Sequence, residues 1–275
     1  MTADPSRTEV APQASPRPDT PGDAVWALDG DTRRHVVVVA DRFARFARGD
    51  RVLTVSGLLD LITAGPGVAG GRWVVHAGQG VDGTDHDRIE AARDRGEAEV
   101  CLADPAAFRQ RPERPETVHK VRPENVLLAG VHRRSATHCR ADLRIHRDNE
   151  LILDHHTGEH VQGIVIIEAM RQICLAQFET AVRPSLAPAA YAGVWQRIDL
   201  SFRDFLFPLP ATVESLIEES DLGRDSHLKF RATTAVRQQG RAVATAVIEY
   251  SMIAQRRVDA LERRRADQVT RAYLG

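Results

Sequence analysis

Residues 154–172 read DHHTGEHVQGIVIIEAMRQ, and this stretch decides the fold. The pattern predicts a helix over Val161–Phe178, and apolar residues would lie on nearly every side of it. A helix with so little polar surface is buried in a protein core. Strand-like runs follow it at Gly193–Phe202, Ala211–Glu219, His227–Arg237 and Arg241–Ser251. This order indicates a sheet of long antiparallel strands wrapped around one buried helix.

The same unit extends upstream of the helix. Val121–Val131 and Thr137–Arg147 alternate or run apolar as strands do, and Asn149–Leu153 is expected to be a short extended piece. A cluster of prolines and charges, RQRPERPE, marks the boundary before the unit, which we place at residues 117–253. Residues 254–275 are expected to form a charged helix with a thin apolar stripe, solvated on the surface.

Before that boundary the pattern predicts a small α/β module over residues 24–108. Strands are predicted at Arg34–Ala40, Trp73–Ala77 and Glu99–Leu102, and helices at Asp41–Arg48, Val55–Thr63 and Asp85–Arg95. Thr54 or Ser56 is expected to cap the second of these helices. Residues 1–23 carry five prolines among small and polar residues. They cannot bury enough surface to offset their ordering entropy, so we expect a disordered leader.

A glycine pattern in the module is typical of nucleotide-binding turns, since Gly78, Gly80 and Gly83 match GxGxxG. Three aspartates that would repel a phosphate surround the glycines: Asp82, Asp85 and Asp87. The turn is also not expected to open an apolar helix directly, as a dinucleotide site requires. We therefore interpret it as a plain turn and the module as a scaffold or docking surface.

The composition is that of an ordinary globular protein, with 43% hydrophobic and 27% charged residues. A net charge of -1 gives the protein no excess of positive charge to attract nucleic acid. The first residues lack the apolar core of a signal peptide, and no stretch is long and apolar enough for a membrane span. Cys101, Cys139 and Cys174 lie far apart, which favours reduced thiols and a cytoplasmic location.

Two blocks of the sequence resemble the A-factor biosynthesis hotdog family: VHKVRPENVLLAG (Val118–Gly130) and the deciding stretch. Members of that family make γ-butyrolactone and related signals in actinobacteria. The resemblance covers about half of the chain and implies the fold class α+β, a single hotdog preceded by the α/β module. Members usually carry two hotdog repeats, and the module shows no second copy of the EAxRQ motif.

The second block also resembles the hotdog dehydratases of fatty-acid synthesis. Gln162-Gly163 stands at their Pro-Gly position and Glu168 at their catalytic acid. Asp154 falls where a dehydratase has its catalytic histidine, with His155 next to it, and either residue could face the site. This departure counts against dehydration, because that reaction uses histidine as the base.

Glu168 and Arg171 are the main catalytic candidates. They are three residues apart and share one face of the predicted helix. An ionised carboxylate in such an apolar helix costs several kcal/mol unless it is paired. Arg171 can pair with it or hold a substrate phosphate, and Gly163 with the first-turn amides can polarise a thioester carbonyl. The alternative is a buried ion pair that only orders the core.

Further candidates flank this pair. Gln172 belongs to the same motif, while His119 and Lys120 open the first block and are either substrate contacts or a strand-edge pair. His160 is either a substrate contact or a packed histidine at the start of the helix. Together with the preceding aspartate and histidines it offers zinc-type ligands, but the spacing supplies no second cluster. We expect no metal and no cofactor.

The resemblance implies an acyltransferase. It would move a β-ketoacyl group from acyl carrier protein or acyl-CoA to the hydroxyl of a glycerol-type phosphate such as dihydroxyacetone phosphate. Glu168 would act as the base and Arg171 would bind the phosphate. The alternatives are a hotdog dehydratase, thioesterase or cyclase, and a non-catalytic acyl or lactone binder. A homodimer is expected because one hotdog leaves a sheet edge uncovered.

Two groups of residues have both a structural and a functional interpretation. A basic stretch is either a solvated strand face or a landing site for an acidic carrier: Arg133, Arg134, Arg140, Arg144 and Arg147. Four aromatic residues are expected in the core, and some could line an acyl tunnel: Trp195, Phe202, Phe205 and Phe207.

Overall fold

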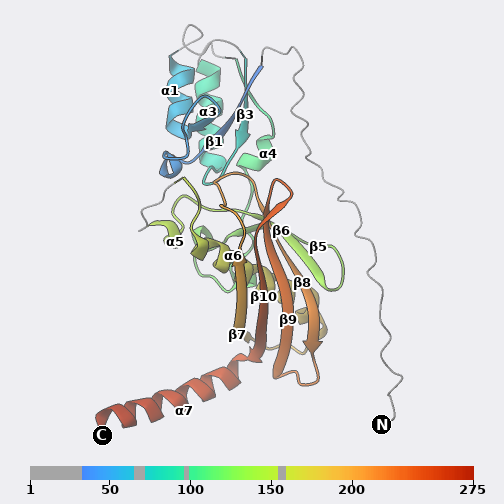
Figure 1. Ribbon diagram of the computed structural model, residues 1–275. Helices are drawn as coiled ribbons and strands as arrows, with labels where there is room; N and C mark the ends of the chain where they lie inside the picture. Colours follow the sequence, from blue (N-terminus) through green and yellow to red (C-terminus); the bar gives the residue numbers. More distant parts are fainter. Residues whose placement is uncertain (1–32, 65–71, 96–98, 154–158) are drawn as a thin grey trace. The chain divides into compact units, whose positions relative to one another are not determined.

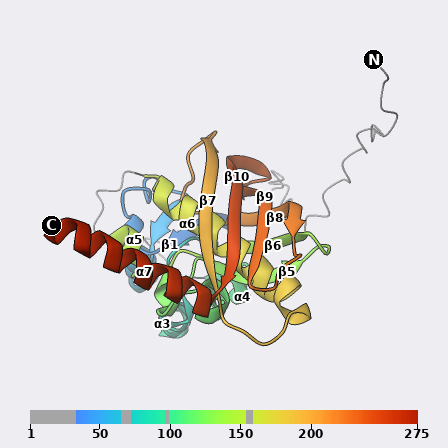
Figure 2. The same ribbon diagram turned by 90° about the horizontal axis from the view of Figure 1, so that it is seen from below.

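The computed structural model describes residues 33–64, 72–95, 99–153 and 159–275. In it a buried helix, α6 (Gly163–Gln177), packs against a six-stranded antiparallel sheet (Figure 1). The strands lie in the order β5 (Leu128–Arg133), β6 (His138–Leu143), β8 (Thr212–Asp221), β9 (His227–Gln238), β10 (Arg241–Ala254) and β7 (Tyr191–Phe202). Figure 2 shows them side by side in front of the helix. The predicted sheet around a buried helix is confirmed.

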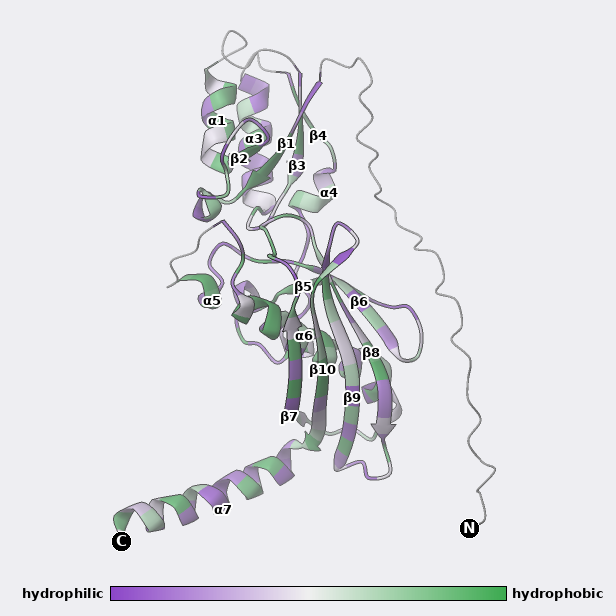
Figure 3. Cartoon of the chain, viewed as in Figure 1, coloured by the Kyte–Doolittle hydropathy of each residue, from purple (hydrophilic) through white to green (hydrophobic). Residues whose placement is uncertain are grey.

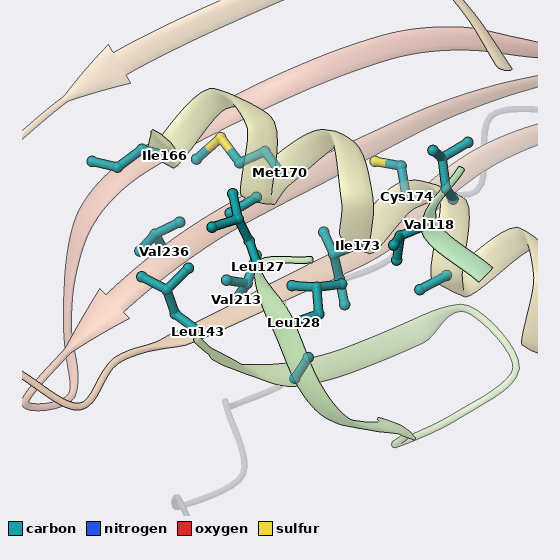
Figure 4. Close-up of a cluster of buried hydrophobic side chains, with 14 of the residues drawn as sticks. Val118, Leu127, Leu128, Leu143, Ile166, Met170, Ile173, Cys174, Val213 and Val236 are labelled. Atoms are coloured by element: carbon teal, nitrogen blue, oxygen red, sulfur yellow. The ribbon is translucent and has the colours of Figure 1, made fainter. Parts of the chain in front are cut away.

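The core lies between this sheet and one side of α6. In Figure 4, Met170 and Ile173 of the helix lie near Leu127 and Val213, and Ile166 of the same buried cluster lies at the start of the helix. All five side chains are at most 2% exposed. Each buried leucine or isoleucine contributes about 1.5–3 kcal/mol relative to an exposed one, so this contact is a main source of stability. The opposite side of the helix is less apolar than predicted and carries the polar residues described below.

A second sheet of four parallel strands precedes the hotdog. It has the order β2 (Val52–Thr54), β1 (Arg33–Val39), β3 (Arg72–Ala77), β4 (Val100–Leu102). The helices α1 (Val55–Thr63), α3 (Gly83–Arg95) and α4 (Pro105–Phe108) accompany it. Val38, Leu58 and Ile89, all fully buried, belong to its own hydrophobic cluster. Thr54 caps α1 by accepting a hydrogen bond from the Gly57 amide at 3.0 Å, as expected. The short β2 was not predicted.

Three local predictions are wrong. Residues expected to be extended form helix α5 (Glu150–Leu153), because the Asn149 side chain accepts a hydrogen bond from the Leu151 amide at 3.0 Å and starts a turn. The strand expected from Val121 begins only at Leu128, since Pro123–Asn125 form a 3₁₀ turn. The helix expected at residues 41–48 is one 3₁₀ turn, Asp41–Phe43.

The remaining helices follow the two sheets. Pro115–Val118 form a 3₁₀ helix, and α6 continues into a π-helical turn, Phe178–Val182, and a 3₁₀ turn, Arg183–Ser185. The C-terminal helix α7 (Gln255–Leu274) buries only Val258, and its surface is mostly hydrophilic in Figure 3. No helix in the described part of the chain combines the length and the apolar character needed to cross a membrane. Cys139 and Cys174 are buried free thiols, and Cys101 is an exposed one.

Residues 33–275 form one compact unit, because the module packs on the hotdog through the predicted glycine turn. The missing side chain of Gly78 leaves room for Val39 and for the Pro208 carbonyl oxygen, which a Cβ would approach to 2.9 Å.

The glycines do connect a strand to a helix, contrary to our expectation. The first turns of α3 and α1, however, are each occupied by a carboxylate of the chain itself. Asp82 Oδ1 accepts from the amides of Thr84 and Asp85, and Asp41 Oδ1 accepts from that of Ser56. A phosphate would have to displace these carboxylates.

Candidate functional site

The Glu168 carboxylate lies at the centre of a charged cluster on the less buried side of α6. Arg171 donates two hydrogen bonds to it, from Nε to Oε2 and from Nη2 to Oε1, each at 2.8 Å. Lys120 Nζ lies 2.8 Å from Oε1, and Gln172 Nε2 donates to the same oxygen at 3.0 Å. The predicted helical pair is therefore joined by Lys120, which is 48 residues away in sequence. Two cations surround one carboxylate, so the three charges sum to +1.

A sharp turn of the backbone brings Lys120 to the helix. The 3₁₀ helix Pro115–Val118 ends at His119, whose φ of 53° lies in the left-handed region. The Lys120 amide then donates back to the Pro115 carbonyl at 2.8 Å. His119 itself is exposed and points elsewhere, with its Nε2 3.7 Å from a carboxylate oxygen of Glu179. The two adjacent candidates are thus separated, and only Lys120 joins the cluster.

Gln172 supports the cluster from inside. Its side chain is fully buried, and its Oε1 accepts from the Leu127 amide at 2.8 Å while its Nε2 donates to the Asn125 carbonyl at 2.9 Å. These bonds hold the start of the first strand segment against the helix. Gln172 therefore orients Glu168 and does not face solvent.

The environment keeps Glu168 ionised. Burial by itself would raise the pKa of this carboxyl, but the hydrogen bonds and charge of Arg171, followed by the bonds from Lys120 and Gln172, outweigh it. The result is a pKa lowered from 4.5 to about 2. A base is most effective when its pKa lies near the working pH, so this carboxylate is a weak proton acceptor in the arrangement seen. It is equally unsuited to donate a proton near neutral pH.

The start of α6 is a second polar feature of this helix. Gln162 is the N-cap residue and 6% exposed, yet neither polar atom of its side chain has a hydrogen-bond partner within the described ranges. Such orphaned buried groups are uncommon and often accompany a ligand or water site. We did not single out Gln162 from the sequence. Its position where dehydratases carry proline is the signal that could have identified it.

Gly163 makes room for an aromatic ring. A Cβ at this position would lie 2.9 Å from Phe202 Cζ, so the ring already occupies the approach that we assigned to a substrate. Phe202 and Phe205 are 53% and 60% exposed, and their predicted place in the core is wrong. Phe202 ends the edge strand β7, and Phe205 lies in the following loop beside His160, with ring centroids 4.6 Å apart.

The remaining aromatic residues are partly buried. Trp195 packs against the main hydrophobic core, as predicted. Phe207 stacks on Phe46 of the module, with ring centroids 5.5 Å apart.

Other predicted site residues lie outside the described residues. These are Asp154 and His155, together with His156, so their relation to His160 stays a prediction. Among the residues that the structure does describe, no group of three histidine, cysteine or acidic side chains is arranged for a metal ion.

The basic stretch is divided by the fold. Arg147 pairs with Asp82 at 2.8 Å and, at still closer range, with the fully buried Asp85. Arg144 is half-buried, and burial lowers its pKa. Only Arg133 and Arg134 remain exposed near the β5–β6 turn, so the possible carrier surface is smaller than predicted.

Comparison with known proteins identifies one domain family and several similar solved structures. Residues 104–254 match the A-factor biosynthesis hotdog domain. A phenylacetic acid degradation-related protein of Ralstonia eutropha is 17% identical, with 57% of this chain and 94% of that chain covered at a TM-score of 0.33. A hypothetical thioesterase of Streptococcus pneumoniae, solved with coenzyme A, is 11% identical, with coverages of 46% and 86% and a TM-score of 0.32. Zebrafish thioesterase superfamily member 2 is 9% identical, with coverages of 44% and 78% and a TM-score of 0.33.

None of the curated proteins matches the sequence. The domain match nevertheless spans more than half of the chain and includes every described residue of the charged cluster. The chain therefore belongs to the A-factor biosynthesis hotdog domain family.

Proposed function

We propose that this protein transfers a β-ketoacyl group from an acyl carrier protein or acyl-CoA thioester to the hydroxyl of a glycerol-type phosphate such as dihydroxyacetone phosphate. The observation that carries the proposal is the pair of cations on Glu168. Lys120 and Arg171 remain 25% and 28% exposed, so an anion from solvent can reach them. Because their charge exceeds that of the carboxylate, a phosphate group fits this cluster.

The two polar features of α6 suit the two ends of such a reaction. Gly163 and Glu168 are five residues apart, which corresponds to about 7.5 Å along a helix axis. Once the exposed Phe202 ring beside Gly163 has moved aside, the free amides at the helix start would stabilise the developing charge on the thioester oxygen. Arg171 and Lys120 would hold the phosphate at Glu168, about one and a half turns further along.

The low pKa of Glu168 changes the role expected for it. We assign Glu168 to hold the two cations in place and to orient the acceptor. The proton acceptor would then be a residue of the stretch before α6: Asp154, His155 or His160. In the transfer the acceptor oxygen attacks the thioester carbon, its proton passes to this base, and the thiolate leaves.

A thioesterase is the second candidate, with water in place of the acceptor. A dehydratase is less well supported, because that reaction needs a protonated carboxyl and the pKa of Glu168 is about 2. A protein that only binds an acyl group or lactone remains the non-catalytic alternative. Glu168→Gln distinguishes this non-catalytic alternative from the enzymes, because apolar binding of an acyl group would persist in the variant.

The test is intact mass spectrometry of a β-ketoacyl carrier protein incubated with the full chain, with and without dihydroxyacetone phosphate. Acyl loss only with the phosphate present supports the transferase. Loss in both conditions indicates a thioesterase, and no loss in either contradicts both. Arg171→Lys should lose transfer while the fold is retained, because an ammonium cannot donate two parallel hydrogen bonds. Arg265→Lys on the exposed helix α7 is the matched control.

Two partners are part of this proposal. If the carrier lands on the β5–β6 turn, reversing the charge of Arg133 and Arg134 should raise the KM for the carrier but not for acyl-CoA. The second partner is another copy of the chain. Within the described residues β7 pairs only with β10, and its twelve-residue outer edge is free to bind a strand. Light scattering should give the mass of a dimer.

A further inference from the structure

The module contacts the hotdog first through a buried amide, Gln79. This side chain is 6% exposed, and all of its hydrogen bonds go to the hotdog backbone. Its Nε2 donates to the carbonyls of Leu143 at 3.0 Å and Leu209 at 3.2 Å, and its Oε1 accepts from the Ile145 amide at 2.7 Å. One residue of the module thus fixes the end of β6 and the loop that follows β7.

A buried ion pair makes the second contact. Asp85, with no exposed surface, accepts from both Nη1 and Nη2 of Arg147, and Asp82 lies 2.8 Å from the same guanidinium. Arg88 of α3 also pairs with Asp85, at 3.3 Å, so Arg147 supplies part of the charge that offsets the desolvation of this buried carboxylate. Residues 143–147, which lead from β6 toward α5, are therefore held along their length.

The third attachment consists of two contacts, one at the end of α5 and one shortly before α6. Arg42 Nη1 donates to the carbonyls of Ile152 and Leu153 at 3.4 and 3.5 Å, at the end of α5. Arg48 Nη1 lies 2.9 Å from Glu159 Oε1, four residues before α6 begins. Both arginines come from residues 41–48 of the module, and we call this pair of contacts the arginine clasp.

The short stretch between Glu159 and the start of α6 is bonded to the loop after β7, and the module binds the same loop. The Val161 amide donates to the Leu206 carbonyl at 2.7 Å. On the same loop the Gln79 amide donates to the Pro208 carbonyl at 3.0 Å. Both chain segments that frame the first turn of α6 are therefore attached to the module.

We propose that the N-terminal module is a positioning element of the acyl site, with Arg42 and Arg48 setting the first turn of α6. The module lies largely outside the matched family domain, which begins at residue 104. The inference rests on the proposed function only for its effect on turnover. The first-turn amides that would stabilise the oxyanion are thus positioned by Arg42 and Arg48, which lie 121 and 115 residues before Gly163 in the chain.

The Arg48–Glu159 pair allows this role to be separated from folding. Its side chains are 70% and 48% exposed, and such exposed pairs contribute little to global stability. Arg48→Glu and Glu159→Arg each place like charges together, and the double exchange restores an opposite pair. Arg45→Glu is the matched control, since this exposed arginine lies on the same turn and has no ion pair within the described ranges.

The experiment measures hydrogen exchange of the full chain by mass spectrometry, in a peptide that covers residues 159–166, alongside steady-state kinetics. Each single variant should exchange about three- to fivefold faster there, which is the size expected when an exposed ion pair is lost. The double exchange should return to the wild-type rate, and Arg45→Glu should not change it. For turnover we expect kcat to fall by a similar factor with KM unchanged, since the amides act on the transition state.

The outcomes separate the two proposals. Single variants that exchange like the wild type would overturn the positioning role, and so would a double exchange that fails to restore it. A faster exchange with unchanged kcat would overturn the link to turnover. If the wild-type protein shows no acyl transfer or hydrolysis, the proposed function fails. The exchange data would still decide whether the module positions α6.

Discussion

The charged cluster makes a specific prediction about acid stability, tested by comparing the wild type with Glu168→Gln. Glutamine keeps the size of the side chain but removes the group that titrates. In the folded protein the pKa of Glu168 is about 2, against 4.5 for the ordinary value. Because the folded-state pKa is depressed, the ionised cluster stabilises the protein above pH 4.5 and loses this effect as the pH falls toward 2.

The size of the effect follows from the shift. At about 1.4 kcal/mol per pKa unit, the depression corresponds to about 3 kcal/mol at neutral pH. Integrating the titration, roughly 1 kcal/mol of it should be lost by pH 4 and roughly 2 kcal/mol by pH 3. The variant has no such dependence at this position. It also leaves Lys120 and Arg171 without their anion, so at neutral pH it should be the less stable protein.

The assay is urea unfolding of both proteins at several pH values between 7 and 3. Other carboxylates titrate in both proteins, so the difference between the two free energies of unfolding isolates Glu168. This difference should narrow by roughly 2 kcal/mol over the range. Two parallel curves would refute the reasoning, because the carboxylate would then have an ordinary pKa. Because the pKa of Glu168 is about 2, a fall in the reaction rate at mildly acidic pH should come from the titration of another group.

The remaining predictions concern glycines and a buried amide. Gly78→Ala should lower the free energy of unfolding by about 2 kcal/mol or more, since the added Cβ would meet the Pro208 backbone. Gly163→Ala should lower it by less than about 1 kcal/mol, because the exposed Phe202 ring can move. Both are measured by thermal and urea unfolding, and equal costs would contradict the assignment of the first glycine to the contact between module and hotdog. Gln172→Leu should cost about 2–3 kcal/mol by leaving a buried amide unpaired, while a neutral result would mean that water replaces the side chain.

Helix α6 and the four long strands were predictable because each carries its own period of apolar residues. The prediction failed where a side chain redirects the backbone locally. Asn149 starts a helical turn in a segment that is apolar enough to resemble a strand. Phe202 was assigned to the core from its chemistry, but an edge strand exposes positions that a central strand would bury.

For the candidate site, the prediction extended only as far as local spacing. The i, i+3 spacing indicated that Glu168 and Arg171 would meet, and they do. It carried no information about Lys120, whose place depends on a left-handed residue and on a turn 48 residues earlier. The arginine clasp was equally hidden, because its two sides come from the module and from the hotdog and lie about 110 residues apart in sequence. Contacts of this kind are set by tertiary packing and leave no pattern in the sequence.

The buried amide of Gln79 has a consequence for how the protein is made. Its acceptor on Leu209 lies 130 residues further along the chain. At translation rates of roughly 5–20 residues per second, the nascent module waits roughly 7–26 s before the ribosome delivers that partner. During this interval the Gln79 side chain is hydrated, because burying it unpaired would cost more than the packing gains. Synthesis therefore places the last step of module folding after the hotdog strands have emerged, and a nascent chain arrested before residue 147 should remain sensitive to proteases around the glycine turn.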